Sequence, residues 1–259
     1  MLTVCYEDHD IIVVEKPSGI ESQSSRGFAP DMVSQIQNYL LSTKISTKWG
    51  KLSTSAGQKP KKFGGNSAPP YVAVIHRLDK PVSGVMVYGK TKKAAAALSS
   101  QLKEGRMDKI YYAVVCGKPV DNVGNYVDYL VQEGKSNGSR IVDKENGEGK
   151  LARLEYQVLA AINRQQQEYS LVRIHLFTGR HHQIRVQFAS RGLPLWGDNR
   201  YHPDFASGKL RGSIALCAAQ LSFFHPVTGK KITCSMKPSG GAFDWFLPEI
   251  FSCSGEGTA

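Results

Sequence analysis

The sequence predicts an α+β fold, in which a few helices pack on a mainly antiparallel mixed sheet. Short apolar segments rich in β-branched and aromatic residues recur along the chain, which is typical of strands. Some are joined by short turn-forming links, such as residues 225–230, and such links favour antiparallel hairpins. Strands do not alternate regularly with helices, and no glycine-rich phosphate fingerprint occurs. A parallel sheet that binds a nucleotide cofactor is therefore not expected.

Nine segments have the length and composition of strands, and two other segments have helix-capping residues at one end. The predicted strands cover residues 11–15, 72–76, 84–89, 109–117, 125–131, 151–161, 168–176, 214–224 and 230–235. Asp31 can cap a helix that ends near Leu41, because its side chain can accept from backbone N–H groups of the first turn. Thr91 can do the same for a helix over residues 92–104, which Gly105 ends.

The composition is that of a protein that buries a substantial core and binds a polyanion. The chain has 259 residues, of which 41% are hydrophobic, enough for one large domain or two ordinary ones. The formal net charge of +11 favours binding to RNA, DNA or an anionic membrane surface. No apolar run approaches the roughly 20 residues that span a bilayer, and no secretion signal opens the chain. We therefore expect an intracellular protein, cytoplasmic by default, with the nucleus or an organelle left open.

The cysteines and one basic segment give further expectations about the chain. Five scattered cysteines without a Cys-x-x-Cys pair predict reduced thiols and no zinc site. Residues 43–70 are rich in Ser, Gly, Thr and Pro, and no Asp or Glu occurs from Met32 to Leu78, so we expect a long flexible basic insertion. It could be a flap that closes over nucleic-acid phosphates or a solvated segment without a role. Residues 252–259 are expected to form a disordered tail.

The segment His76-Arg77-Leu78-Asp79-Lys80-Pro81-Val82-Ser83-Gly84 is the strongest candidate for a catalytic loop. It places one carboxylate between two predicted strands, and loops on rigid strands commonly carry chemistry. The local sequence leaves two interpretations of Asp79. It either caps the turn with its side chain, as Asp often does near Pro or Gly, or takes part in a reaction.

Four segments in the same order resemble the motifs of the RluA-type pseudouridine synthases. Residues 76–84 resemble the motif that carries the family's catalytic aspartate, and residues 6–19 its opening strand and Lys-Pro-x-Gly turn. Residues 109–115, Lys-Ile-Tyr-Tyr-Ala-Val-Val, resemble the tyrosine strand, and residues 176–186 the third motif. Four collinear matches are far more specific than any one of them.

The resemblance implies a cofactor-free isomerase that converts specific uridines of structured ribosomal or transfer RNA into pseudouridine. It implies the pseudouridine synthase fold, with a central active-site cleft across the sheet and one catalytic domain over residues 1–251. The small S4 domain that many relatives carry in front has no counterpart in this sequence. RNA is the expected partner, no membrane contact is expected, and a monomer is the default.

The resemblance assigns three catalytic residues. Asp79 matches the nucleophile, Arg185 the cation that pairs with it, and Tyr111 the aromatic residue that stacks on the flipped uracil. A nearby cation keeps a carboxylate ionised, which suits the first pair. Tyr111 and Tyr112 point to opposite sides of a strand, so only one of them can enter the cleft. Without the resemblance, Arg185 could equally be a solvent-exposed helix residue and Tyr111 an ordinary strand aromatic.

The expected RNA-binding residues come from the catalytic loop and the third motif. Arg77 could fill the gap that a flipped base leaves, or brace the loop through a salt bridge. His76 could orient the loop by a hydrogen bond. Arg180, His181 and Gln183 lie at the start of a predicted helix, where an RNA phosphate or a buried acid is expected nearby. The neighbouring His181 and His182 do not share a helix face, so a metal site is not expected.

Two other functions stay open at this point. The domain could be an inactive RNA-binding or ribosome-assembly factor, although the presence of Asp79, Tyr111 and Arg185 argues against lost catalysis. It could also be another carboxylate enzyme acting on nucleic acid, such as a glycosylase or nuclease. Departures from the family pattern occur at Phe177, His181, Gln187 and Cys217, outside the catalytic positions, and they put target choice in doubt rather than activity.

Overall fold

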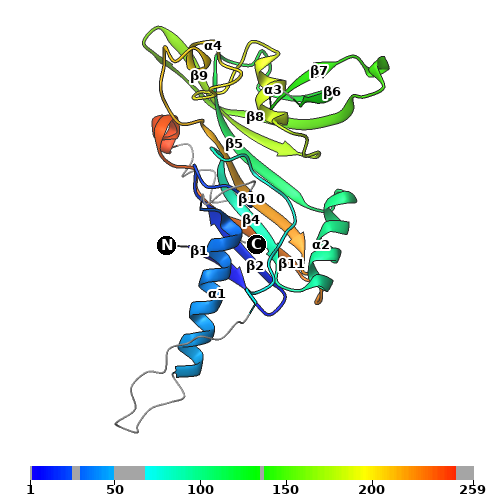
Figure 1. Cartoon of the computed structure of the whole chain (residues 1–259). Helices are drawn as coiled ribbons and strands as arrows, with labels where there is room; N and C mark the ends of the chain where they lie inside the picture. Colours follow the sequence, from blue (N-terminus) through cyan, green and yellow to red (C-terminus); the bar gives the residue numbers. More distant parts are fainter. Residues whose placement is uncertain (1, 25–29, 50–67, 135–136, 249–259) are drawn as a thin grey trace.

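A single mixed sheet is the scaffold on which the rest of the protein is built (Figure 1). The structure, a computed structural model, describes residues 2–24, 30–49, 68–134 and 137–248. In these residues the strand order is β1-β2-β4-β10-β5-β9-β8-β6-β7, with β11 paired to β10 and β3 to β4. Neighbouring strands are antiparallel except β4 and β10, which are parallel. The predicted mixed, mainly antiparallel sheet is confirmed.

The strand bounds agree closely with most of the predictions. The strands are β1 (Thr3–Glu7), β2 (Ile11–Lys16), β3 (Ala73–Val74), β4 (Ser83–Gly89), β5 (Asp108–Cys116), β6 (Val123–Glu133), β7 (Gly138–Val142), β8 (Lys150–Arg164), β9 (Gln167–Leu176), β10 (Leu216–Phe224) and β11 (Lys231–Ser235). The strand predicted over residues 72–76 is reduced to β3. Strands β1 and β7 were not predicted as strands. Both lie at ends of the sheet and have one partner, so pairing rather than an apolar run defines them.

The helices are short except for α1. They are α1 (Met32–Trp49), α2 (Lys92–Lys103), α3 (Gln183–Ala189) and α4 (Pro203–Ala206), with 3₁₀ turns at Lys144–Asn146 and Gly241–Phe246. Thr91 caps α2 as predicted, its hydroxyl accepting from Ala94 N (3.2 Å). In the described part of the chain, no helix is long and apolar enough to cross a membrane.

Helix α1 is longer than predicted. Asp31 accepts from Ser34 N (3.1 Å) at its start, as expected of a cap, but the helix continues past Leu41 to Trp49. The hydroxyl of Ser42 donates to Tyr39 O (2.7 Å), so this polar residue stays compatible with a helix. The flexible loop predicted from residue 43 is therefore wrong for residues 43–49. Residues 50–67 of that prediction, and the predicted tail 252–259, lie outside the described residues.

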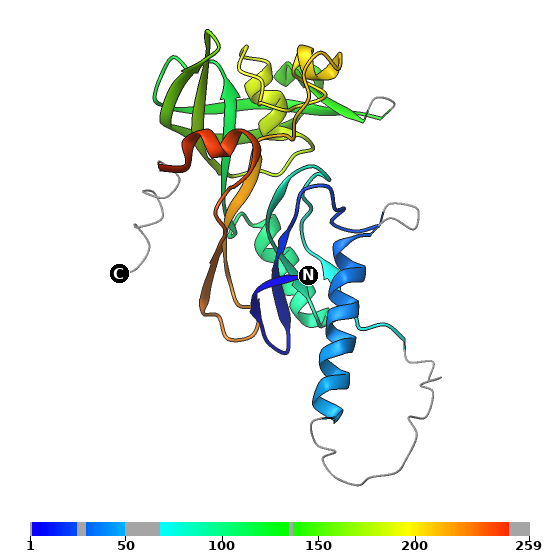
Figure 2. The ribbon, with the colours of Figure 1, turned by 90° about the vertical axis from the view of Figure 1, so that its left-hand side faces the viewer.

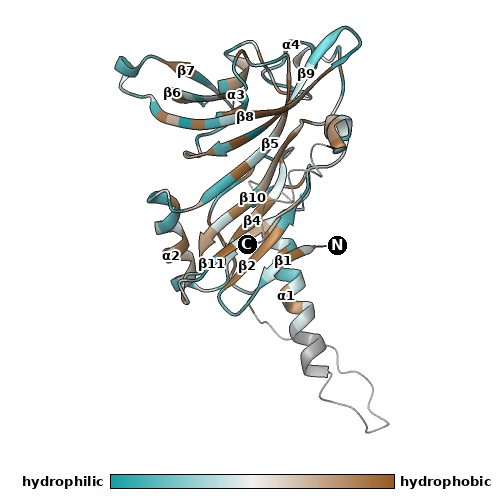
Figure 3. Ribbon diagram, turned by 180° about the vertical axis from the view of Figure 1, so that it is seen from behind, coloured by the Kyte–Doolittle hydropathy of each residue, from teal (hydrophilic) through white to brown (hydrophobic). Residues whose placement is uncertain are grey.

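Hydrophobic packing covers both faces of the sheet. Figures 2 and 3 show α1 on one side of β2 and the hydrophobic positions concentrated along the strands. Met32 and Ile36 of α1 are fully buried in a core that also includes Ile12 and Val14 of β2. The alternate residues of β2, among them Ile11, belong to a second core under α2. This alternation follows from the two-residue period of a strand.

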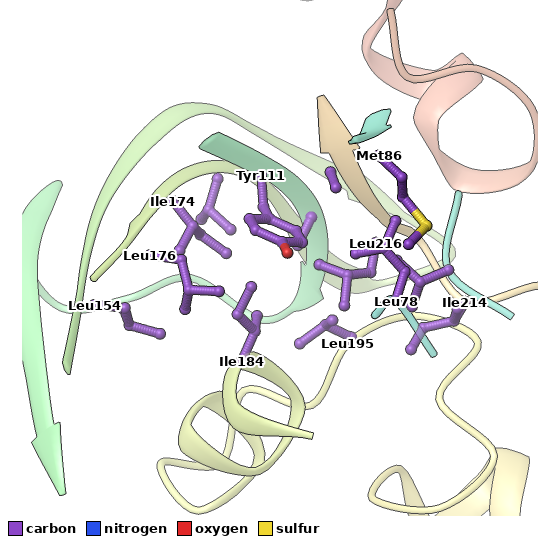
Figure 4. Close-up of a cluster of buried hydrophobic side chains, with 14 of the residues drawn as sticks. Leu78, Met86, Tyr111, Leu154, Ile174, Leu176, Ile184, Leu195, Ile214 and Leu216 are labelled. Atoms are coloured by element: carbon purple, nitrogen blue, oxygen red, sulfur yellow. The ribbon is translucent and has the colours of Figure 1, made fainter. Parts of the chain in front are cut away.

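The first core continues to the segment that carries the third motif. Figure 4 shows the Tyr111 ring of β5 beside Ile174 and Ile184. Phe188 of α3 is fully buried and lies edge-on to Tyr126, with ring centroids 5.1 Å apart. Because Ile184 and Phe188 fix one face of α3, the intervening Arg185 has a fixed direction.

Gly84 ends the candidate catalytic loop, residues 76–84, for a steric reason. It is the second residue of β4 and lies at the short parallel pairing of this strand with β10, opposite Ala218. A Cβ atom at Gly84 would lie 2.8 Å from Ala218 Cα, and the backbone φ is +153°. Only glycine permits this close approach without displacing a strand. The end of the loop is therefore held at a defined position in the sheet.

Candidate active site

Asp79 lies in the loop between β3 and β4, and the backbone on both sides of it is held by neighbouring residues. Ser22 Oγ accepts from Leu78 N (3.0 Å) and donates to Leu78 O (2.8 Å). Lys80 O accepts from Gly19 N (2.8 Å). The carboxylate of Asp79 is 29% exposed, so it faces open space from a fixed loop.

Lys16 is a buried cation that sequence reasoning did not assign. Its Nζ is enclosed at the end of β2 and donates to the carbonyl oxygens of Pro17 (3.0 Å), Ile20 (2.6 Å) and Lys80 (3.0 Å). Burial lowers its pKa to about 8, and the charge of Asp79 acts in the opposite direction. The Lys-Pro-x-Gly turn thus supplies a positive charge that joins the opening strand to the catalytic loop.

Arg185 connects Asp79 to a second carboxylate. The guanidinium is 4% exposed, and Nη1 donates to Asp79 Oδ2 (3.1 Å). Nε and Nη2 each donate to one oxygen of Asp198, both at 2.8 Å. Bidentate pairing fixes the plane of a guanidinium as well as its position. The side chain that reaches Asp79 is therefore oriented from behind by Asp198.

Asp198 is a site residue that the sequence did not reveal. It is fully buried and also accepts from Arg200 N (2.9 Å) and Tyr201 N (3.1 Å). Burial by itself raises the pKa of this carboxyl, but the bonds and charge of Arg185 outweigh it and hold the pKa below its usual range. The Gly197-Asp198 turn has no spacing relation to Arg185, so only the folded chain brings the two together.

His182 flanks Asp79 on the other side of the pair. Its Nε2 lies 3.4 Å from Asp79 Oδ2, and its Nδ1 lies 3.0 Å from the hydroxyl of Tyr201. The His181 ring stacks on it, with centroids 3.8 Å apart. Burial lowers the pKa of His182 to about 4, against the charge of Asp79, so the ring is neutral near pH 7. Two acids thus lie near the start of α3: Asp79, which is partly exposed, and Asp198, which is the buried one.

Tyr111 and Tyr112 point to opposite faces of β5. Tyr111 is 8% exposed, packs in the first core and lines the cleft with Asp79. Tyr112 packs against a different core. Burial, and then the charge of Asp79, raise the pKa of the Tyr111 phenol above its usual value. Tyr111 is therefore the neighbour that enters the cleft, in a neutral form.

These residues lie along one open cleft of about 1410 Å³. Asp79, Tyr111 and Arg185 line it, and so do four of the five residues expected to bind RNA: His76, Arg77, Arg180 and His181. The basic residues of the lining are Arg77, Lys80, Lys103, Lys109, Lys150, Arg180, Arg185 and Arg200, whereas the acidic ones are Glu21, Asp79 and Glu148. The cleft therefore attracts an anion.

Gln183 differs from the expectation. It is 2% exposed and does not line the cleft. Its Oε1 accepts from Thr178 Oγ1 (2.8 Å) and Arg180 N (3.0 Å), and its Nε2 donates to Arg153 O (3.2 Å). Its polar atoms are used to brace the loop before α3, so it supports Arg180 rather than offering a contact of its own.

The ring of His76 contacts the backbone of the neighbouring strand β4. His76 Nε2 accepts from Val87 N (3.5 Å), and burial, followed by the charge of Lys109, lowers its pKa to about 4. The ring therefore links the catalytic loop to β4, the orienting contact that was expected. Among the residues that the structure describes, no group of His, Cys, Asp and Glu is arranged to hold a metal ion.

Comparisons with known proteins agree on one family. The family model described as RNA pseudouridylate synthase matches residues 10–190. An uncharacterized RNA pseudouridine synthase of Synechocystis is 35% identical over 95% of this chain and 68% of its own length. The dual-specificity RNA pseudouridine synthase RluA of Vibrio cholerae is 32% identical over 87% of this chain and 78% of its own length. The ribosomal large subunit pseudouridine synthase D of Zymomonas mobilis is 30% identical over 89% of this chain and 67% of its own length.

Solved structures show the same fold. Human RNA pseudouridylate synthase domain containing 4 superposes with a TM-score of 0.66 over 96% of this chain and 93% of its own, at 19% identity. Human RNA pseudouridylate synthase domain containing 1 superposes with a TM-score of 0.65 over 97% of this chain and 95% of its own, at 18% identity. The predicted pseudouridine synthase fold is thereby confirmed.

The neutral state of His182 leads to a pH prediction. In the unfolded chain a histidine takes up a proton near pH 6.5, whereas folded His182 does so only near pH 4. Its contribution to stability is therefore fully present above pH 6.5 and is lost as the pH falls toward 4. We expect His182→Asn to flatten the decline of the unfolding free energy over this interval, measured by urea denaturation.

His9→Asn is the matched control, because the side chain of His9 is 87% exposed. It should leave the decline as steep as in the parent. An equally steep decline in His182→Asn would contradict a buried neutral ring at this position.

Proposed function

We propose, from the premise that the chain belongs to the RNA pseudouridylate synthase family of isomerases, that it converts specific uridines of structured ribosomal or transfer RNA with Asp79 as the nucleophile. The observation that carries the proposal is the ion pair of Asp79 with buried Arg185 inside a basic cleft. The Zymomonas relative is named for the large ribosomal subunit, which supports a ribosomal target.

The reaction sets the requirements that the cleft must meet. The uridine leaves the stack, its bond from ribose C1′ to N1 breaks, and a bond from C1′ to C5 forms. C5 loses its hydrogen and N1 gains one, so the product is an isomer and no cofactor is consumed. Extruding a nucleotide needs a pocket that holds one base and a surface that holds the backbone. A cleft of about 1410 Å³ with mainly basic charges suits both needs.

Asp79 supplies the negative charge for this exchange. An ionised carboxylate can attack the ribose or the uracil ring, or stabilise a cationic sugar-like transition state. Arg185 lies in hydrogen-bond contact with Asp79 Oδ2 and places a positive charge beside it. Because Asp198 holds the same guanidinium at two further points, the carboxylate keeps one orientation while the base turns.

Tyr111 acts on the base in this proposal. Its ring stacks on the extruded uracil, and its hydroxyl assists removal of the C5 proton. A phenol that burial keeps neutral can donate or relay a proton without adding negative charge beside Asp79. Tyr112 belongs to the other face of β5 and has no such role.

The remaining parts bind the RNA. Arg77 is exposed at the cleft and fills the gap left in the helix, because a guanidinium is planar and always charged. Arg180 and His181 contact the backbone from the loop before α3. Residues 1–251 act as one catalytic domain, since β1 to β11 share one sheet.

Asp79→Asn tests the proposal directly. The amide keeps the shape of the side chain but cannot act as an anionic nucleophile, so activity should fall about a thousandfold or more. RNA affinity should stay within about twofold, since the change removes no cation. Activity is measured as tritium release from RNA labelled at C5 of uridine, and affinity by filter binding.

Asp121→Asn, an exposed position outside the cleft lining, is the matched control and should keep full activity. Parent protein that binds RNA but releases no tritium from any RNA would favour the alternative of an inactive RNA-binding or assembly factor. Release of free uracil would instead indicate a glycosylase.

Tyr111→Phe tests the role of the phenol. Loss of the hydroxyl removes the proton-transfer group but keeps the stacking ring, so tritium release should fall about a hundredfold or more with RNA affinity retained. Tyr112→Phe changes the same atoms on the other face of β5, and its activity should stay within about twofold of the parent. Equal effects of the two substitutions would reject the assignment.

A further inference from the structure

A buried lysine without an acidic partner lies in the cleft, apart from the catalytic pair. Lys109 of β5 is 8% exposed and lines the cleft two residues before Tyr111, on the same face of the strand. Within the described ranges its ammonium group makes no hydrogen bond or ion pair. The charged residue that acts on Lys109 is Arg180, which is also a cation and therefore repels it.

The residues that the structure does not describe offer almost no acid that could pair with Lys109. The stretches that the structure leaves out, 25–29, 50–67 and 135–136, contain no Asp or Glu, and only the segment 249–259 has any. The adjacent Asp108 points away, 3.7 Å from His175 and 3.8 Å from Lys231. In the described residues, the Lys109 ammonium therefore faces the open cleft without an acid beside it.

Such a charge is unfavourable in the free protein. Removing an ammonium from water costs free energy unless an anion or several acceptors replace the water. Burial and then Arg180 accordingly lower the pKa of Lys109 to about 8. Lys16, the other buried lysine, differs in that three carbonyl oxygens accept from it. Lys109 has no such acceptor among the described residues, so its ammonium is left to a group that enters the cleft.

The approach to Lys109 is open, and its neighbour is rigid. A Cβ atom at Gly179 would lie 3.7 Å from Lys109 Nζ and, apart from its neighbours in the chain, within 4 Å of no other atom. The glycine therefore leaves space beside the ammonium group. Gln183 holds the backbone of Arg180, and Arg180 Nε donates to Leu151 O (2.8 Å). That bond leaves the outer nitrogens of the guanidinium for a ligand. Two preplaced cations therefore lie beside an open space.

We propose that Lys109 and Arg180 together bind one backbone phosphate of the RNA, beside the nucleotide that enters the cleft. This deepens the proposed function and rests on it for the identity of the anion. Lys109 and Tyr111 are about 7 Å apart along the strand. A base stacked on Tyr111 therefore has a phosphate within reach of the pair. Phosphate supplies acceptor oxygens that no described protein group offers to this ammonium.

Lys109→Met separates this role from a structural one. Methionine keeps the length of the side chain and removes the charge, so the melting temperature should stay equal or rise. The affinity for a fluorescein-labelled oligouridylate should fall about tenfold at low salt. The slope of log affinity against log salt should become shallower by about 0.7, the value for one phosphate of a single strand. Lys109→Arg should recover most of the slope.

Lys93→Met is the matched control, because Lys93 is exposed on α2 and lies outside the cleft lining. It removes the same charge and should leave the slope unchanged. A parental slope in Lys109→Met would overturn the proposal, as would a lower melting temperature with no change in slope.

The same variants distinguish this inference from the proposed function. Tritium release by the parent, together with a parental slope in Lys109→Met, would reject the phosphate site and leave the isomerase standing. No tritium release by the parent, together with a shallower slope in Lys109→Met, would do the reverse.

Discussion

The guanidinium of Arg185, shared between two carboxylates, is the interaction on which the site depends. It joins Asp79 of the catalytic loop to Asp198 of a distant turn, and the cation and Asp198 are almost completely buried. Buried charges are tolerated only when each has a partner with good geometry. Because Asp198 accepts two of the guanidinium's hydrogen bonds, Asp79 accepts a single one and remains partly exposed to the cleft.

The sheet serves this arrangement by holding three separate segments in register. Lys16 and Ser22 fix the backbone around Asp79, and Gly84 fixes the end of its loop against β10. Phe188 anchors α3 and thereby directs Arg185. Lys109 in the cleft follows a different principle. Among the described residues it has no acid beside it, so the free energy that its partial burial costs can be recovered when an anion enters the cleft.

Local pattern was sufficient for most of the strands and for the opposite directions of the neighbouring tyrosines, whereas the choice of Tyr111 came from the resemblance to the family motif. A strand alternates its faces, so the placement of Tyr111 and Tyr112 on opposite sides could be derived without coordinates. The extent of α1 could not be derived in this way, because a segment rich in serine and threonine has the composition of a loop. In the folded helix, such a hydroxyl can bond to the preceding turn, as that of Ser42 does. Asp198 and Lys16 could not be assigned either. Asp198 lies 13 residues from Arg185, and Lys16 lies 64 residues from Lys80, and no local spacing encodes contacts that only tertiary structure creates.

The most direct test of this account is the rate of pseudouridine formation in Asp198→Asn under single-turnover conditions, with folding checked by circular dichroism. Asparagine keeps the shape of the turn but weakens the hold on Arg185, so Asp79 should lose its orientation. The account predicts a fall of about a hundredfold in rate, the scale expected for a misplaced catalytic group, with RNA affinity within about twofold of the parent. A folded variant that reacts at the parental rate would contradict it.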